Sequence, residues 1–300
     1  MTHTFESWTA EHVPDQSGKT VLITGANSGI GYFTARALAE AGAHVIVAGR
    51  DIDKVAQAIA KIDPQRVSGT LEAGLLDLAS LASVNTFATD ILGRHSTLDI
   101  LVNNAGVMMP PAAKTEDGFE QQIGVNFIGH FALTGLLYDR LSQTPDARIV
   151  TLSSIAHRGG IIDFDNMKLE KPYDPKREYY QSKLADLMFA LELGRRIDAK
   201  GHKLLSLACH PGFTTTELQR HLDPKFLEGM SFMDTWQGSL PTLMAATIAA
   251  PKQGSYYGPD GPGEFGGFPA IGAIDDAALD ADTAQKLWDL GQSATGVRFP

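Results

Sequence analysis

Short apolar runs rich in β-branched residues alternate along this chain with longer stretches whose apolar positions recur at helical spacing. The first run, T-V-L-I-T at residues 20–24, is followed by a helical pattern over 32–41. Uninterrupted apolar runs of this length are typical of strands that are buried on both faces of a parallel sheet. Further strands are predicted over 44–48, within 70–76, and over 99–102, 147–152 and 203–208, and further helices over 51–62, 78–93, 117–142 and 177–199.

Strands that alternate with helices predict βαβ units, so the fold class is α/β. We expect a single Rossmann-type, doubly wound parallel sheet of about seven strands with helices on both faces. A length of 300 residues would allow two domains, but no polar linker divides the chain. One domain is therefore predicted over 1–300, with an N-terminal extension at 1–17 and a C-terminal segment at about 251–300. Proline and glycine punctuate residues 161–176 and 251–272, which are predicted to form loops.

The segment between the first predicted strand and its helix is a glycine-rich turn, T-G-A-N-S-G-I-G at residues 24–31. Glycines permit a tight turn and a close approach of the backbone, so that N–H groups at the helix start can face a pyrophosphate. A position between strand and helix is the context that a dinucleotide-binding turn requires. We therefore expect the cofactor phosphates to be bound by Gly25, Asn27, Ser28, Gly29, Ile30 and Gly31.

The spacing of this turn, G-x-x-x-G-x-G after a threonine, resembles that of the short-chain dehydrogenase/reductase family. Three further family motifs follow in order: N-N-A-G at 103–106, Y-x-x-S-K at 179–183, and P-G-x-x-x-T at 211–216. The resemblance covers roughly residues 18–220. It implies that the remaining cofactor contacts come from Asp77, Leu78, Asn103, Ala105, Tyr179, Lys183, Pro211, Gly212 and Thr216.

The end of the second predicted strand indicates which nicotinamide cofactor is bound. NAD-binding sites place a carboxylate there, where it bonds the ribose 2′-hydroxyl, but this chain has Gly49 followed by Arg50. A guanidinium can grip a 2′-phosphate through charge-assisted hydrogen bonds. We expect NADP(H) to be preferred, while Asp51 beside the arginine leaves NAD(H) open and Arg50 could also be a solvated surface charge.

A phenol has a pKa near ~10, too high for efficient proton exchange at neutral pH unless its surroundings favour the phenolate. Tyr179 and Lys183 are four residues apart, so on a helix they share a face, and the ammonium would lower the pKa of the phenol. Tyr180 could also reach Lys183. The resemblance selects Tyr179 as the catalytic acid and base and gives Lys183 the tasks of anchoring ribose and tuning Tyr179.

Two polar positions complete the catalytic set that the resemblance implies. Ser154, the second serine after the fifth predicted strand, would donate a hydrogen bond to the substrate oxygen, with Ser153 as an alternative. Asn126 corresponds to the family's catalytic asparagine and would hold a helix distortion and a water that relays protons to Lys183.

The segment at about 213–236 falls where the family has its substrate lid. Its apolar residues are expected to form the wall of a pocket for a hydrophobic carbonyl compound or alcohol, although packing within a helix is the alternative. Ser154 and Tyr179 lie 25 positions apart, about twice the gap of compact members. This gap resembles that of the branch containing retinol dehydrogenases and the WW-domain oxidoreductase. The lid residues concerned are Phe213, Phe226, Phe232, Met233 and Trp236.

Charge and composition exclude several other classes of function. Acidic residues outnumber basic ones by 35 to 25, giving a net charge of −10, which argues against nucleic-acid binding. The single cysteine, Cys209, forms no intrachain disulfide and is expected to be a buried apolar residue, and His157 and His210 lack metal-ligand spacing, so no metal site is predicted. No apolar run is long enough to span a membrane and none resembles a signal peptide, so the predicted location is cytoplasmic.

Two alternative functions use the same features. A sugar-nucleotide epimerase or dehydratase also uses a Tyr-x-x-x-Lys pair, but the glycine spacing and the lack of a large C-terminal substrate domain count against it. A catalytically idle, cofactor-sensing regulator would use the fold to bind a partner. By resemblance, the helices over 117–142 and 177–199 could pair between subunits of a dimer or tetramer.

Overall fold

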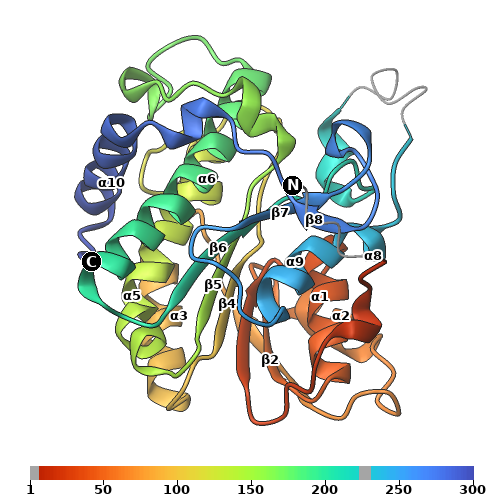
Figure 1. The fold of residues 1–300 in the computed structure, drawn as a ribbon. Helices are drawn as coiled ribbons and strands as arrows, with labels where there is room; N and C mark the ends of the chain where they lie inside the picture. The colour runs from red at the N-terminus through yellow and green to blue at the C-terminus, as the bar shows by residue number, and fades with distance from the viewer. Residues whose placement is uncertain (1–6, 223–230) are drawn as a thin grey trace.

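The computed structural model describes residues 7–222 and 231–300. Within these ranges, the centre of the fold is an eight-stranded sheet with the strand order β3-β2-β1-β4-β5-β6-β7-β8, in which β8 runs antiparallel to β7 and the other neighbouring strands are parallel (Figure 1). The predicted α/β doubly wound sheet is confirmed, with one strand more than expected. The strands are β1 (Thr20–Thr24), β2 (His44–Gly49), β3 (Thr70–Leu75), β4 (Ile100–Asn103), β5 (Arg148–Leu152), β6 (Leu205–Cys209), β7 (Tyr256–Pro259) and β8 (Pro269–Ile271).

Helices cover both faces of the sheet. On one face lie α3, α5, α6 and α10, and on the other lie α1, α2, α8 and α9 (Figure 1). The helices are α1 (Gly29–Glu40), α2 (Ile52–Ala60), α3 (Leu81–Arg94), α4 (Gln121–Ile123), α5 (Gly129–Gln143), α6 (Pro175–Lys200), α8 (Thr235–Gly238), α9 (Leu240–Thr247) and α10 (Ala281–Thr295).

Alternation of side chains along the strands divides the core into two apolar layers. In β1, Leu22 packs into the layer under α5 and α6, whereas Val21 and Ile23 pack into the layer under α1 and α9. All three side chains are fully buried. This is why the sequence of β1 is apolar at every central position rather than at alternate ones.

Two segments differ from the sequence-based prediction. The segment at 251–272, which was expected to be a loop, contains β7 and β8. The sequence pattern does not indicate these strands, because both are short and β7 ends in proline. The helix expected over 117–142 is interrupted: a π-helical segment, Gly124–Ile128, separates α4 from α5. π-helical turns inside α-helices are frequent at functional sites.

The strand order places a crevice between β1 and β4. Connections from β1 lead to β2 on one side, whereas β4 lies on the other side, so the order reverses between these two strands. Ligands of open α/β sheets bind beyond the carboxyl ends of the strands at such a point. The glycine turn follows β1 and the N-N-A-G segment follows β4, so both border the crevice.

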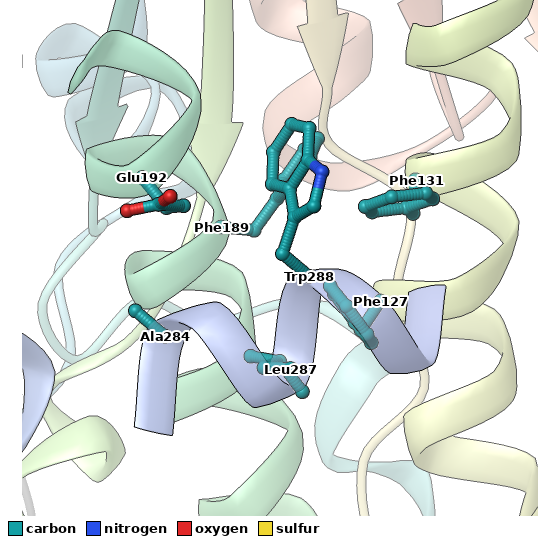
Figure 2. A pocket seen from close by; sticks show the side chains of 7 residues that line it. All are labelled: Phe127, Phe131, Phe189, Glu192, Ala284, Leu287 and Trp288. Carbon is teal, nitrogen blue, oxygen red and sulfur yellow. The ribbon is translucent and has the colours of Figure 1, made fainter. Parts of the chain in front are cut away.

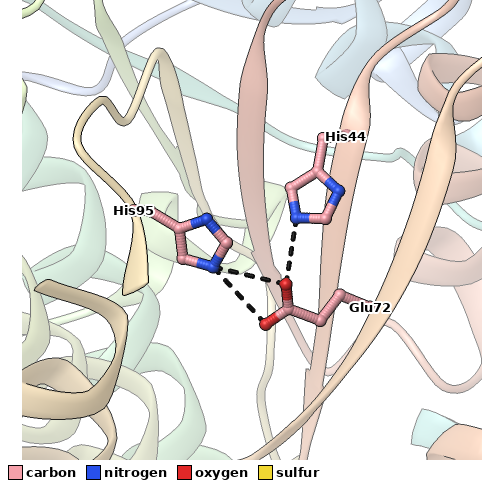
Figure 3. A group of neighbouring side chains, drawn as sticks. All are labelled: His44, Glu72 and His95. Carbon is pink, nitrogen blue, oxygen red and sulfur yellow. Dashed lines mark hydrogen bonds and ion pairs between the residues drawn. The ribbon is translucent and has the colours of Figure 1, made fainter. Parts of the chain in front are cut away.

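A cluster of one carboxylate, two imidazoles and a guanidinium joins β2 and the edge strand β3 to the end of α3 (Figure 3). Glu72 accepts hydrogen bonds from His44 (3.0 Å) and His95 (3.4 Å), and its other partner is Arg94. Burial raises the pKa of Glu72, but Arg94 and the two imidazoles outweigh this effect and lower it. These contacts fasten the edge strand β3 to the helix beside it.

The C-terminal helix α10 packs on α5 and α6, the two helices expected to pair between subunits. Trp288 of α10 stacks on Phe189 of α6 and meets Phe131 of α5 edge-on, at ring-centroid distances of 6.0 and 5.1 Å (Figure 2). Phe299 adds a further ring, 4.8 Å from Trp288. The aromatic cluster therefore anchors the last twenty residues to the face of the sheet behind the crevice.

Candidate active site

The glycine turn passes so close to the segment after β4 that two of its positions cannot carry a side chain. A Cβ atom on Gly25, which has a φ of +65°, would lie 2.8 Å from Cα of Ala105. A Cβ atom on Gly31 would lie 2.5 Å from Nδ2 of Asn104. At these two positions the backbone of the turn and of the start of α1 lies directly against the segment after β4. These residues fit the pyrophosphate of a dinucleotide.

Thr24, the last residue of β1, is the hydrogen-bonding centre of this arrangement. Its hydroxyl oxygen accepts hydrogen bonds from the backbone N–H groups of Asn104 and Ala105, both at 2.9 Å. Its hydroxyl group donates to Nε2 of His130 on α5, with Oγ1 and Nε2 2.8 Å apart. Burial lowers the pKa of His130 to about 4, so its imidazole is neutral and can accept this bond. The threonine before the turn thus fixes the separation of β1, β4 and α5.

The two asparagines of N-N-A-G have different roles. Asn104 donates from its side chain to the backbone oxygen of Thr24 at 2.7 Å, tying the two loops together. Asn103 was expected from the family resemblance to contact the cofactor. Its side chain is 1% exposed, and its amide donates to the hydroxyl of Thr134 at 3.0 Å. The structure therefore directs the Asn103 side chain into the core, away from the crevice, and leaves only its backbone for a cofactor contact. Sequence reasoning missed Asn104.

At the end of β2, Arg50 is exposed to solvent and the carboxylate of the next residue, Asp51, is hydrogen-bonded. Arg50 is exposed, whereas the carboxylate of Asp51 caps α2 by accepting a hydrogen bond from the backbone N–H of Lys54 at 3.1 Å. Asn27 of the glycine turn extends to the same place, since a Cβ on Gly49 would lie 2.8 Å from its side-chain oxygen. Asn27 therefore lies against Gly49, the residue that precedes Arg50.

The remaining expected cofactor residues lie around the same crevice. Asp77 accepts a hydrogen bond from the backbone N–H of Ala79 at 2.9 Å, and Leu78 beside it is buried. Thr216 packs over Gly29, whose Cβ would lie 3.7 Å from its methyl group. The segment after β6 therefore closes over the turn after β1. Two further residues, Ser28 and Ile30, lie at the start of α1. Pro211 and Gly212 follow the end of β6, so all four lie beyond the carboxyl ends of the strands.

The long helix α6 carries the tyrosine and lysine that the sequence predicts to be catalytic. Asp174 caps its N-terminus, and Tyr179 and Lys183 follow on one face, each 5% exposed. Burial raises the pKa of Tyr179 above its usual value, while the charge of Lys183 and the hydroxyl of Ser154 act to lower it. The nearby ammonium predicted from the sequence is present, but in the protein alone its effect is smaller than that of burial.

The structure separates both pairs of alternatives that the sequence left open. The hydroxyl of Ser153 is buried and donates to the backbone oxygen of Lys183 at 2.7 Å, so it fastens β5 to α6. Ser154 is half-buried and faces Tyr179. The ring of Tyr180 packs against Gly159, where a Cβ atom would lie 2.8 Å from it. Ser154 and Tyr179 thus lie next to each other, whereas the hydroxyl of Ser153 and the ring of Tyr180 contact other parts of the fold.

Asn126 lies within the π-helical segment and connects three parts of the site. Its side-chain oxygen accepts from the backbone N–H of Val107 at 2.8 Å, and its amide donates to the hydroxyl of Ser182 at 2.9 Å. Its backbone oxygen accepts from Nδ1 of His130 at 2.7 Å. The helix distortion expected at this residue is present, and the side chain joins the N-N-A-G segment to α6.

Three residues of this network were not selected from the sequence: Ser182, His130 and Asp186. Ser182 also donates to the backbone oxygen of Tyr179 at 2.8 Å. Asp186 accepts a hydrogen bond from the Lys183 ammonium at 2.8 Å. The sequence did carry a signal for Asp186, because Tyr179, Lys183 and Asp186 follow helical spacing along one face.

Apolar side chains gather beside this centre at the expected lid. Phe213 stacks on Phe265 with centroids 4.5 Å apart, and Phe232 lies 6.0 Å from Phe213. Trp236, in contrast, is 42% exposed, and Phe226 lies outside the described residues. The backbone N–H of Met233 donates to the backbone oxygen of Phe213 at 2.8 Å and closes the base of the segment. Its described part is an apolar wall shared with the C-terminal segment.

The other polar candidates take part in packing and hydrogen bonding. Burial raises the pKa of the fully buried Cys209 thiol to about 12, so the thiol is neutral. His210 donates to Glu264 at 2.8 Å, and Glu264 also pairs with Arg158 at 2.6 Å. His157 bonds the backbone oxygen of Ser154 at 2.6 Å. These contacts fix the loop after β5 and the segment after β7 beside the crevice.

Over residues 7–222 and 231–300, no helix combines the length and apolar character needed to cross a bilayer.

Comparisons with known proteins agree with this geometry. The family model described as short chain dehydrogenase matches residues 19–226. Human retinol dehydrogenase 13 is 40% identical over 290 residues, which cover 94% of this chain and 86% of that protein. A crystal structure of an uncharacterised protein from Mycobacterium paratuberculosis superimposes with a TM-score of 0.83 at 41% identity, covering 98% of this chain and 99% of the other. A candidate gluconate 5-dehydrogenase from Beutenbergia cavernae, solved with bound NADP, superimposes with a TM-score of 0.64 at 25% identity, covering 81% of this chain and 95% of that one.

Proposed function

Because the chain belongs to the short-chain dehydrogenase family, we propose that it is an NADP(H)-dependent oxidoreductase acting on an apolar carbonyl or alcohol substrate. The observation that carries this proposal is the position of Tyr179. Its buried phenol lies on the same face of α6 as Lys183, faces Ser154, and stands at the strand ends where the glycine turn opens. An acid, a cation and a hydroxyl donor are thus gathered beside a dinucleotide-binding turn.

The residues present fit a nicotinamide dinucleotide. The cradle between Gly25, Gly31 and the N-N-A-G segment is one that any side chain would fill. NADP(H) would supply or accept hydride at nicotinamide C4, and its oxidised form would add a positive charge beside Tyr179. Lys183 uses two of its three ammonium hydrogens on Asp186 and on the backbone oxygen of Leu152, which leaves one for a ribose hydroxyl.

The end of β2 supports a preference for the 2′-phosphorylated cofactor. Arg50 is exposed beside the turn, and the carboxylate of Asp51 is already engaged at the N-terminus of α2. A phosphate there would meet the guanidinium and the positive end of the helix dipole of α2. No carboxylate stands at position 49 to repel it.

In the reduction direction, Tyr179 donates its proton to the substrate oxygen as charge develops there. Ser154 donates a hydrogen bond to the same oxygen and stabilises that charge. Lys183 provides the positive charge that favours the resulting phenolate. Asn126 holds the N-N-A-G segment against α6, so that the groups keep their spacing. In the oxidation direction the phenolate of Tyr179 takes the proton back.

An apolar substrate is supported by the wall beside the site and by the relatives. The stacked rings of Phe213 and Phe265 join the lid segment to the C-terminal segment. A human relative that is 40% identical carries the name retinol dehydrogenase, and retinol is an apolar alcohol. We propose a carbonyl or alcohol of this general character, without assigning a particular compound.

The experiment is an activity panel with matched variants. Purified protein is incubated with NADPH and a series of apolar aldehydes and ketones, and with NADP+ and the corresponding alcohols. We expect turnover with several members, its loss in Tyr179→Phe, and its retention in Tyr180→Phe, whose ring packs on Gly159. NADPH binding should remain nearly intact in both variants. Tight NADPH binding without turnover by the unmodified protein would instead favour a cofactor-sensing regulator.

A further inference from the structure

Asp186 is a carboxylate buried in the apolar interior of the site. It lies on α6, is 2% exposed, and forms an ion pair with Lys183 at 2.8 Å. Removing a carboxylate from water costs several kcal/mol unless a close opposite charge offsets it. Its position is not part of the Y-x-x-S-K motif. A buried charge beside the catalytic lysine calls for an explanation in terms of what it does to that lysine.

Asp186 and the end of β5 hold the ammonium between them. Nζ of Lys183 donates to Asp186 at 2.8 Å and to the backbone oxygen of Leu152 at 3.1 Å. The position that a Cβ on Gly106 would take lies 3.7 Å from this nitrogen and 3.3 Å from the side-chain oxygen of Asn126. The ammonium is therefore fixed next to the N-N-A-G backbone, on the side where a cofactor would lie.

Among the described groups that face Lys183, only Asp186 is an anion at neutral pH, its own pKa being raised by burial to about 6. The thiol of Cys209 on β6 has a pKa raised by burial to about 12, and the imidazole of His130 on α5 has one lowered by burial to about 4, so both are neutral. Tyr179 on α6 is the remaining titratable neighbour. Burial acts to lower the pKa of Lys183, but the charge of Asp186, which has the largest opposing effect, outweighs it together with Tyr179 and the hydrogen bond to Asp186, and the pKa is raised.

Asp186 acts on Tyr179 in two opposite ways. Its negative charge disfavours the phenolate directly, whereas its support of the Lys183 ammonium favours the phenolate indirectly. The charge of Lys183 has the greater influence on Tyr179, and the carboxylate the smaller. Loss of the carboxylate would leave the buried lysine free to shed its proton, and Tyr179 would lose its cation. The net effect of Asp186 is thus to favour the phenolate.

We propose that Asp186 is a positioning residue that keeps the buried Lys183 ammonium charged and fixed, and through it sets the proton affinity of Tyr179. This role rests on the proposed function, since it concerns the same acid and base. It adds a third member, one helical turn further along α6, to the Tyr179–Lys183 pair.

The test uses Asp186→Asn, which keeps the shape and a hydrogen-bond acceptor but removes the charge. The pH dependence of kcat/KM for alcohol oxidation is measured for this variant, for Asp186→Glu, and for the control Asp198→Asn on the exposed side of α6. We expect the acidic limb of Asp186→Asn to move to higher pH by about one unit, with a loss of about tenfold below the limb. Asp186→Glu should restore part of the shift, and Asp198→Asn should leave the profile unchanged.

A second readout keeps this test independent of turnover. The ultraviolet pH titration of Tyr179, taken as the difference between each protein and its Tyr179→Phe form in the presence of NADP+, reports the phenol pKa directly. That pKa should be higher in Asp186→Asn than in the parent. An unchanged or lower phenol pKa would overturn the proposal, as would a uniform loss of activity at every pH together with a lower melting temperature. Absence of turnover in the parent protein would contradict the proposed function, while the titration would still decide the role of Asp186.

Discussion

Oγ1 of Thr24 and Nε2 of His130 lie 2.8 Å apart, joining the end of β1 to the helix behind the crevice. The same hydroxyl oxygen accepts hydrogen bonds from the N–H groups of Asn104 and Ala105. Through these bonds one threonine side chain sets how far the glycine turn stands from the N-N-A-G segment. That separation decides whether a pyrophosphate fits.

We expect Thr24→Val to weaken both the fold and cofactor binding. Valine has nearly the same shape but takes the acceptor from the backbone N–H of Ala105, whereas the N–H of Asn104 keeps the backbone oxygen of Val102 at 3.0 Å. An unsatisfied buried N–H costs about 1–3 kcal/mol of unfolding free energy. Denaturant unfolding and NADPH binding by fluorescence measure the two effects. The control is Thr34→Val, because the hydroxyl of the equally buried Thr34 bonds only the preceding turn of α1. Equal behaviour of the two variants would contradict the role assigned to Thr24.

Replacement of Arg50 by alanine should discriminate between the two nicotinamide cofactors. A guanidinium on a phosphate contributes about 1.5–3 kcal/mol, so the Kd for NADPH should rise roughly tenfold to a hundredfold while that for NADH changes little. Arg195→Ala, on the outer face of α6 where the arginine pairs with Glu192, is the control. Equal changes for NADPH and NADH would remove the assignment of Arg50 to the 2′-phosphate.

Truncation of Trp288 should destabilise the fold strongly. The side chain is 2% exposed and packs among Phe131, Phe189 and Phe299. Trp288→Ala is expected to cost about 3–5 kcal/mol, measured by denaturant unfolding. It should also increase self-association, measured by light scattering, because it uncovers apolar faces of α5 and α6. Leu279→Ala, at a side chain that is 52% exposed, should change neither quantity.

Acid should loosen the segment after β7 before it unfolds the sheet. Burial raises the pKa of Glu264, but the hydrogen bonds and charges of His210 and Arg158 outweigh it and lower the pKa to about 2. A lowered carboxyl pKa contributes stability that is present above the ordinary value of about 4.5 and is lost as the pH falls toward 2. The pKa of His210 is lowered by burial, so its contribution also declines on acidification.

The variant Glu264→Gln separates this effect from general acid unfolding. It should melt at a lower temperature than the parent at pH 7, and the difference should shrink as the pH falls from about 4.5 to 2. Asp260→Asn, four residues earlier, is the comparison. A difference that persists unchanged at pH 2 would show that the carboxylate charge does not matter.

The sequence predicted the buried parallel strands closely because their apolar runs are continuous. The bounds of β1 agree with the predicted 20–24, and β2 extends one residue further than predicted. It did not predict β7 and β8, since strands of four and three residues in a segment rich in glycine and proline carry no periodic signal. The π-helical segment around Asn126 was expected only from the family resemblance.

For the site, motif spacing located the residues that belong to the family motifs, but not the residues that hold them in place through hydrogen bonds. Tyr179 and Lys183 could be paired because four residues separate neighbours on one helix face. The bonds from Thr24 to Asn104 and from Asn126 to Ser182 join elements 80 and 56 residues apart, and only tertiary packing brings such partners together. The inward direction of the Asn103 side chain, which bonds Thr134, was hidden for the same reason, and a cofactor contact through its backbone stays a prediction.

Transfer of deuterium tests the central claim most directly. The protein is incubated with NADPH carrying deuterium at nicotinamide C4, prepared separately in each stereochemical form, and with an apolar ketone that is reduced in the activity panel. The account predicts that one form delivers a single deuterium to the carbinol carbon, detected by mass spectrometry, and that Tyr179→Phe delivers none while still binding NADPH. Undiminished deuterium transfer in Tyr179→Phe, or no transfer from either form with the parent protein, would contradict it.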